Sequence, residues 1–302
     1  MSILSVIGNT PLVELSNVNG KSNVKIFAKF EGCNPGGSVK DRPAYYMVQK
    51  AEEGGKLSKD KIILEPTSGN MGISLAMIGS AKGYRVKLCM PECVSIERQR
   101  TLEAFGAEVE LTPAREGTDG AIRRAHEILE HDPEKYFMPN QFENENNSLA
   151  HYETTGPEIY KQTKGKIDAF VAGMGTTGTL MGVGKYLKEK KPKVKIIGIE
   201  PTEGHKIQGL KNMNESIVPL IYHPKELDEK IVVDDDDAFE MMRTLATKEG
   251  TFVGISSGAA VAGAIMVAEK IKSGTIVCIF PDRGDRYLST NLFMSTCAQC
   301  PP

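Results

Sequence analysis

Short apolar runs alternate with helix-length segments along nearly the whole chain, and this alternation limits the possible folds more than any other feature. Strand-like runs rich in Val, Ile, Leu and Phe occur at residues 24–30, 61–65, 85–90, 107–112, 169–173, 194–200 and 275–280. Segments of helical length lie at residues 40–54, 70–83, 95–105, 117–130, 178–190, 238–249 and 258–272. This order predicts an α/β fold of right-handed βαβ units, with mainly parallel twisted sheets flanked by helices.

The chain has 302 residues, which is enough for two lobes that share one site. The alternation is interrupted by an Asn-rich stretch at residues 140–148 and by an irregular stretch at 203–230. We therefore predict a smaller N-terminal α/β lobe over residues 35–147 and a larger α/β lobe made of residues 1–34 and 148–302. Ligands of parallel α/β sheets bind at the carboxyl ends of the strands, so loops that follow strands are the candidate site.

Charge and hydropathy exclude several classes of partner. The chain carries 37 basic and 39 acidic residues, a formal net charge of −2, which gives no basic surface for nucleic acid or an anionic membrane. No apolar stretch reaches the roughly 18 residues that a membrane span needs. The N-terminal residues lack the basic and long apolar regions of a secretory signal, so we expect a cytoplasmic protein.

The cysteines and histidines predict neither a disulfide framework nor a metal site. The six cysteines are scattered, which suits a reducing compartment, and the five histidines show no metal-ligand spacing. Cys297 and Cys300 form a CxxC pair, but a zinc site needs two further ligands at matching spacing. We interpret this pair as part of a chain terminus and expect no metal.

The first loop with chemical character is GMGTTGT at residues 173–179, which follows a predicted strand and opens a predicted helix. Its amides and the helix N-terminus favour an anion. The letters also match G-x-G-x-x-G, and Glu200 lies where a ribose-binding acid would, so a dinucleotide site and a purely structural turn both stay open. The hydroxyls of Thr176, Thr177 and Thr179 favour a terminal phosphate.

The second loop, NPGGSVKDR at residues 34–42, places Lys40 at the start of a predicted helix. The N-terminus of a helix disfavours a cation, so the pKa of this amine should fall and favour the neutral nucleophile of a Schiff-base lysine. The alternative is an ordinary solvated lysine.

The third loop, EPTSGNMG at residues 65–72, joins a predicted strand to the next helix. Ser68 and Asn70 are good N-cap residues, so helix capping alone would explain the loop. The hydroxyls of Thr67 and Ser68 and the amide of Gly69 can also bind a carboxylate.

Together these motifs resemble the fold-type II pyridoxal 5′-phosphate (PLP) enzymes of the cysteine synthase (O-acetylserine sulfhydrylase) family, whose fold is like that of tryptophan synthase β. IGNTPLV at residues 7–13, GISSG at 254–258 and DRGDRYLST at 282–290 are similar to further motifs of that family. The resemblance covers nearly the whole chain. The phosphate-type loop and the DRGDR segment resemble the B branch more than the A branch.

The resemblance implies a role for each matching residue. Lys40 would bind the cofactor as a Schiff base, Asn70 its phenolic oxygen and Ser256 its ring nitrogen, with Ser257 as the second choice. The phosphate would be held by Gly175, Thr176, Thr177, Gly178 and Thr179. The substrate carboxylate would be bound by Thr67, Ser68, Gly69 and Gln141. Met71 departs from the pattern, because the family usually has a threonine there, which puts part of the carboxylate contact in doubt.

The implied activity is β-replacement, which makes L-cysteine or S-sulfocysteine and acetate from O-acetyl-L-serine and sulfide or thiosulfate. A neutral serine at the ring nitrogen weakens the electron sink and favours loss of a β-substituent over transamination. The resemblance also implies a homodimer. Cystathionine β-synthase, cyanoalanine synthase and serine or threonine dehydratase share the fold and stay open. An NAD-binding oxidoreductase and a non-catalytic relative are the alternatives from other classes.

Overall fold

The computed structural model describes residues 2–67 and 69–290, and the elements follow the predicted alternation. The strands are β1 (Leu12–Glu14), β2 (Val24–Phe30), β3 (Ile62–Pro66), β4 (Arg85–Pro91), β5 (Glu108–Thr112), β6 (Tyr136–Phe137), β7 (Ala169–Gly173), β8 (Lys195–Pro201), β9 (Glu229–Val233) and β10 (Gly274–Phe280). The helices are α1 (Asp41–Glu53), α2 (Asn70–Lys82), α3 (Ile96–Ala104), α4 (Gly117–His131), α5 (Asn146–Ala150), α6 (Gly156–Gln162), α7 (Gly178–Lys190), α8 (Asp235–Glu249) and α9 (Ile255–Lys270).

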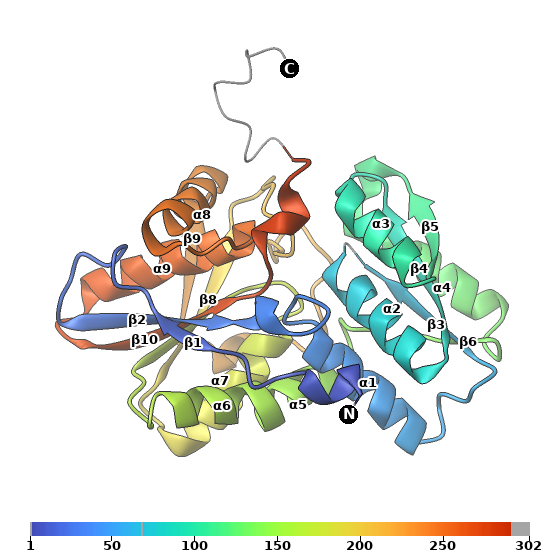
Figure 1. Ribbon diagram of the computed structural model, residues 1–302, viewed down its shortest axis with the longest axis horizontal. Coiled ribbons are helices and arrows are strands. Elements are labelled where there is room, and N and C mark those ends of the chain that lie inside the picture. Colours follow the sequence, from blue (N-terminus) through green and yellow to red (C-terminus); the bar gives the residue numbers. More distant parts are fainter. Residues whose placement is uncertain (1, 68, 291–302) are drawn as a thin grey trace, which may run out of the picture.

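The strands form two separate sheets. Four strands in the order β5-β4-β3-β6 are all parallel. Six strands in the order β1-β2-β10-β7-β8-β9 are parallel except for the antiparallel pair β1–β2. The predicted α/β class with mainly parallel sheets is therefore confirmed. Figure 1 shows the two sheets side by side, each with its own helices.

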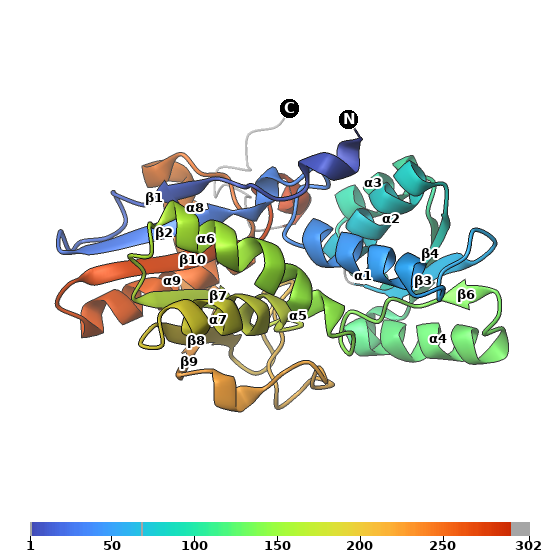
Figure 2. The same ribbon diagram turned by 90° about the horizontal axis from the view of Figure 1, so that it is seen from below.

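Helices cover both faces of each sheet, which explains why the strands read as continuous apolar runs. On the four-stranded sheet, α1, α2 and α3 pack on one face and α4 on the other (Figure 2). On the six-stranded sheet, α8 and α9 pack on one face, while α6 and α7 pack on the other. Alternate residues of one strand supply the two cores: Cys278 belongs to the α9 side, and Val277 and Ile279 to the α7 side.

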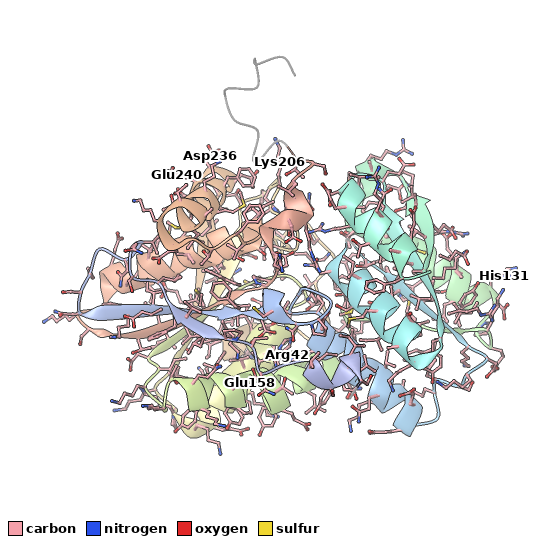
Figure 3. All side chains as sticks on the ribbon, viewed as in Figure 1. Arg42, His131, Glu158, Lys206, Asp236 and Glu240 are labelled. Atoms are coloured by element: carbon pink, nitrogen blue, oxygen red, sulfur yellow. The ribbon has the colours of Figure 1, made fainter. Side chains whose placement is uncertain are left out.

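A buried ion network joins α1 to the six-stranded half. Arg42, in the first turn of α1, donates from Nε to Glu31 Oε2 at 2.7 Å and from Nη1 to Glu158 Oε1 at 2.6 Å. Lys29 Nζ reaches the other oxygen of Glu158 at 2.7 Å. Figure 3 shows Arg42 and Glu158 together near the junction of the two halves. Because charges this deeply buried are stable only when paired, the network fixes the position of α1 beside the six-stranded sheet.

Some elements differ from the prediction. Strands β1, β6 and β9 were not predicted, nor were α5, α6 and the π-helical turn between them, His151–Thr155. Helix α9 begins at Ile255 rather than at residue 258, so the GISSG motif lies largely inside its first turn. In the part of the chain that the structure describes, no helix is both long and apolar enough to cross a membrane.

Candidate active site

A cavity of about 420 Å³ opens between the two sheets, at the carboxyl ends of their strands. Loops after β3 and β7 line it, together with the segment before α1 and residues 205–211 after β8. The predicted site residues among its lining are Lys40, Thr67, Asn70, Gln141, Gly175 and Thr176. Residues from three sequence motifs, one of which is more than 100 residues from the other two, thus meet in one place.

Lys40 is the residue immediately before α1, and its amine faces the loop that follows β7. Its Nζ lies 3.5 Å from Thr176 Oγ1. Burial lowers the pKa of Lys40 to about 8, against a smaller opposing effect of the Glu65 carboxylate. The sequence predicted a lowered pKa from the position at a helix start. The structure attributes the lowering to desolvation, because the amine is enclosed by the cavity wall.

The loop GMGTTGT bends sharply from β7 into α7. Thr177 adopts a left-handed φ of 68°, and α7 begins at the next residue. Glycine is required at two positions of this bend. A Cβ on Gly178 would lie 2.1 Å from Asn147 Oδ1, and one on Gly175 would lie 2.5 Å from the Gly209 carbonyl oxygen.

The donors of this loop suit a phosphate. The Oγ1 atom of Thr177 is buried and has no hydrogen-bond partner, which leaves its hydroxyl free to donate to a ligand. Thr179 lies in the first turn of α7, and its Oγ1 is 3.2 Å from His151 Nε2. An unpaired buried hydroxyl at a helix N-terminus fits the phosphate of PLP.

Thr67 caps the start of α2, a role that was predicted for Ser68 and Asn70. Its Oγ1 accepts from the amides of Gly69 at 3.0 Å and of Gly72 at 3.3 Å, whereas the Gly69–Asn70 junction has no side-chain cap. Ser68, the other predicted hydroxyl donor, lies outside the described residues, as do Cys297 and Cys300.

Asn70 is held by the segment after β10, a contact that sequence reasoning missed. Its Nδ2 donates to Asp282 Oδ2 at 2.6 Å, and its Oδ1 accepts from Arg286 Nη1. Arg286 also donates from Nη2 to the Gly36 carbonyl, and Tyr287 donates to Asp282 at 2.7 Å. One N–H of the Asn70 amide remains for a ligand. Residues of the DRGDR motif thus bind both the loop that carries Asn70 and the loop that carries Gly36.

The remaining predicted residues are placed as follows. Ser256 and Ser257 lie in the first turn of α9 and are 4% and 0% exposed, outside the lining of the cavity. The buried Ser257 Oγ has no hydrogen-bond partner.

Met71 lines the cavity but is only 1% exposed and packs in the core beneath α2. Glu200 accepts from the Met213 amide at 3.0 Å and from Lys230 at 2.7 Å, so it is already paired.

Within the described residues, no three His, Cys, Asp or Glu side chains converge as a metal site would require. The cysteines there, Cys33, Cys89, Cys93 and Cys278, are all free thiols.

Comparison with known proteins agrees with this geometry. Residues 3–282 match the family described as pyridoxal-phosphate dependent enzyme. Cysteine synthase B of Salmonella typhimurium is 46% identical over 287 residues, which cover 95% of this chain and 94% of that protein. A crystal structure of cysteine synthase from Entamoeba histolytica superimposes with a TM-score of 0.91 at 41% identity, covering 97% of this chain and 90% of that one.

An O-acetylserine dependent cystathionine β-synthase from Helicobacter pylori superimposes with a TM-score of 0.92 at 36% identity, covering 97% of this chain and 99% of that one. These matches cover 90% or more of this chain and of each related protein, and the family match over residues 3–282 includes Lys40 and the loop at residues 173–179. The dinucleotide alternative gains no support from them. This chain belongs to the cysteine synthase family of pyridoxal-phosphate-dependent enzymes, in its B branch.

Proposed function

We propose that this enzyme makes L-cysteine, or S-sulfocysteine, together with acetate from O-acetyl-L-serine and sulfide or thiosulfate. The observation that carries the proposal is the convergence of Lys40, Asn70 and the Gly175–Thr176 turn on one cavity. The family and its cysteine synthase members supply the cofactor and the reaction class.

The residues present fit PLP, and their roles follow from their chemistry. Lys40 would hold the cofactor covalently and Asn70 would bind its phenolic oxygen. Residues 175–179 would hold its phosphate. Ser256 would meet its ring nitrogen, and we keep Ser257 as the second choice. When bound, PLP withdraws electrons from the substrate Cα and thereby acidifies the Cα proton.

Lys40 would then act as the general base and acid. A neutral amine is needed to take the Cα proton, and burial provides it by lowering the pKa of Lys40 to about 8. Acetate departs from Cβ, the sulfur nucleophile adds there, and the Lys40 ammonium returns its proton to Cα. Thr67, Ser68, Gly69 and Gln141 would bind the substrate carboxylate and keep the Cα proton directed at this amine.

We also propose a homodimer in the cytoplasm, with lobe boundaries at residues 35–147 and at 1–34 plus 148–302. The separate four- and six-stranded sheets support the two lobes. The charge balance of −2 argues against nucleic acid and anionic membranes as partners. Light scattering of the purified protein at twice the mass of 32.9 kDa would support the dimer.

The proposal is tested by giving the purified yellow protein O-acetyl-L-serine with sulfide, thiosulfate or homocysteine in separate assays, and by identifying the product by mass spectrometry. We expect cysteine or S-sulfocysteine with release of acetate. The Lys40→Ala variant should lose turnover and the visible cofactor absorbance, whereas Lys50→Ala, on the exposed side of α1, should keep both. A product formed only from homocysteine, or an active Lys40→Ala protein, contradicts the proposal.

A further inference from the structure

The fully buried carboxylate of Glu65 accepts hydrogen bonds from the segment that carries Gln141. Glu65 lies near the end of β3 and is 0% exposed. Its Oε2 accepts from the Asn140 amide at 2.8 Å and its Oε1 from the Gln141 amide at 3.0 Å. Asn140 has a left-handed φ of 52°, and such a residue turns successive N–H groups towards one side. The Gln141 side chain adds a third contact, from Nε2 to the Pro66 carbonyl at 3.3 Å.

The same segment is held from its other side by Asn147. The Asn147 amide donates from Nδ2 to the Gln141 carbonyl at 2.8 Å and to Thr176 Oγ1 at 3.2 Å. Thr176 is the residue whose hydroxyl lies 3.5 Å from Lys40 Nζ. A continuous set of hydrogen bonds therefore runs from Glu65 through Gln141, Asn147 and Thr176 to Lys40. A shift of Gln141 cannot occur without disturbing this set.

We propose that Glu65 is a positioning residue, which holds Gln141 beside Thr67 so that both can bind the carboxylate of the amino-acid substrate. This inference rests on the proposed function, since it concerns how that substrate is bound. Only a carboxylate offers one acceptor oxygen to each of two neighbouring N–H donors. A glutamine at this position would place its own NH2 group against one of them.

The burial of this acid is costly, which argues for a specific task. Burial raises the pKa of Glu65 to about 7, while the amides of Gln141 and Asn140 and the charge of Lys40 act in the opposite direction. An apolar residue would fill the end of β3 at less cost, but it would leave two backbone N–H groups without acceptors.

The chain contains a matched control. Glu200 also ends a parallel strand, is followed by a proline as Glu65 is, and is 4% exposed. It likewise accepts a backbone amide, that of Met213 at 3.0 Å, yet Met213 does not line the cavity, whereas Gln141 does. Glu200→Gln therefore removes a buried acid with similar structural duties and without contact to Gln141.

The experiment compares wild type, Glu65→Gln and Glu200→Gln. With saturating sulfide, we expect Glu65→Gln to raise the KM for O-acetyl-L-serine by about 10-fold, the effect of one lost hydrogen bond to a positioned group, with kcat changed less than about 2-fold. Glu200→Gln should leave this KM unchanged. In cofactor-free protein, amide hydrogen exchange of the peptide covering residues 139–142 should accelerate in Glu65→Gln only.

The inference is overturned by an unchanged KM in Glu65→Gln, by an equal rise in both variants, or by unchanged exchange at residues 139–142. A wild type that does not turn over O-acetyl-L-serine refutes the proposed function, while the exchange measurement still decides whether Glu65 holds the segment. If Glu65→Gln does not fold, Glu65→Asp takes its place. The aspartate keeps the charge but is too short to reach both amides, so its KM should rise as well, and a wild-type KM overturns the inference.

Discussion

The reactivity of Lys40 in the cofactor-free protein gives the most direct test of the site. Burial lowers the pKa of this amine from 10.5 to about 8. At pH 8 about half of the Lys40 side chains are then neutral, whereas a lysine with a pKa of 10.5 is about 0.3% neutral. The neutral fraction of Lys40 at pH 8 is therefore roughly 150-fold larger, and this fraction governs how labelling of the amine depends on pH.

The assay is competitive labelling with acetic anhydride between pH 6 and pH 11, followed by peptide mapping. Lys40 labelling should rise with pH, with its midpoint near pH 8, and level off at higher pH. Lys50 is the internal control, because its hydrogen bond with Glu53 raises its pKa, so its labelling should continue to rise above pH 10. If the labelling curves of Lys40 and Lys50 coincide, the desolvation argument is refuted.

Two further substitutions test the phosphate loop and the ion network. Gly178→Ala places a Cβ 2.1 Å from Asn147 Oδ1, so the dissociation constant for PLP, measured by fluorescence titration, should rise about 10-fold or more, as overpacking of about 1–3 kcal/mol implies. Gly20→Ala, with no atom within 4 Å, should bind PLP as wild type does. Arg42→Met leaves the buried Glu31 carboxylate without an ion pair and Glu158 with Lys29 as its ion-pair partner, and should lower the free energy of unfolding by about 3–5 kcal/mol in urea titrations. Arg124→Met breaks exposed pairs only and should cost about 0–1 kcal/mol; equal losses in both variants would contradict the burial argument.

The sequence predicts the long elements of this fold well because their signal is local. Strands buried on both faces read as apolar runs, and β2 and β7 begin and end at their predicted residues. The missed strands give weaker signals: β6 has only two residues, and β9 alternates buried and exposed positions at the edge of its sheet. The Asn-rich region concealed α5 because Asn favours turns over helices, and only packing against α1 and α7 offsets that preference.

The candidate site likewise contains residues that the local sequence predicts and residues that it does not. Lys40 and the phosphate loop could be found because glycines and hydroxyls stand next to predicted strand ends. The clamp of Asn70 by Asp282 and Arg286 joins residues more than 200 positions apart, and no local pattern encodes such a pairing. Glu65 did leave a local signal, since it is an acid at the end of an otherwise apolar run. The role of Glu65 becomes clear only from the structure, in which the amides of Asn140 and Gln141 donate to its carboxylate.

The position of β10 has a consequence for synthesis on the ribosome. This strand is made after all the other described strands, yet it lies between β2 and β7 in the middle of its sheet. The four-stranded half, encoded within residues 41–137, can acquire its layers while translation continues. The six-stranded half must wait with two exposed strand edges until residue 280 leaves the exit tunnel. A ribosome that stalls before that point would release a chain with one finished half and no site for its cofactor.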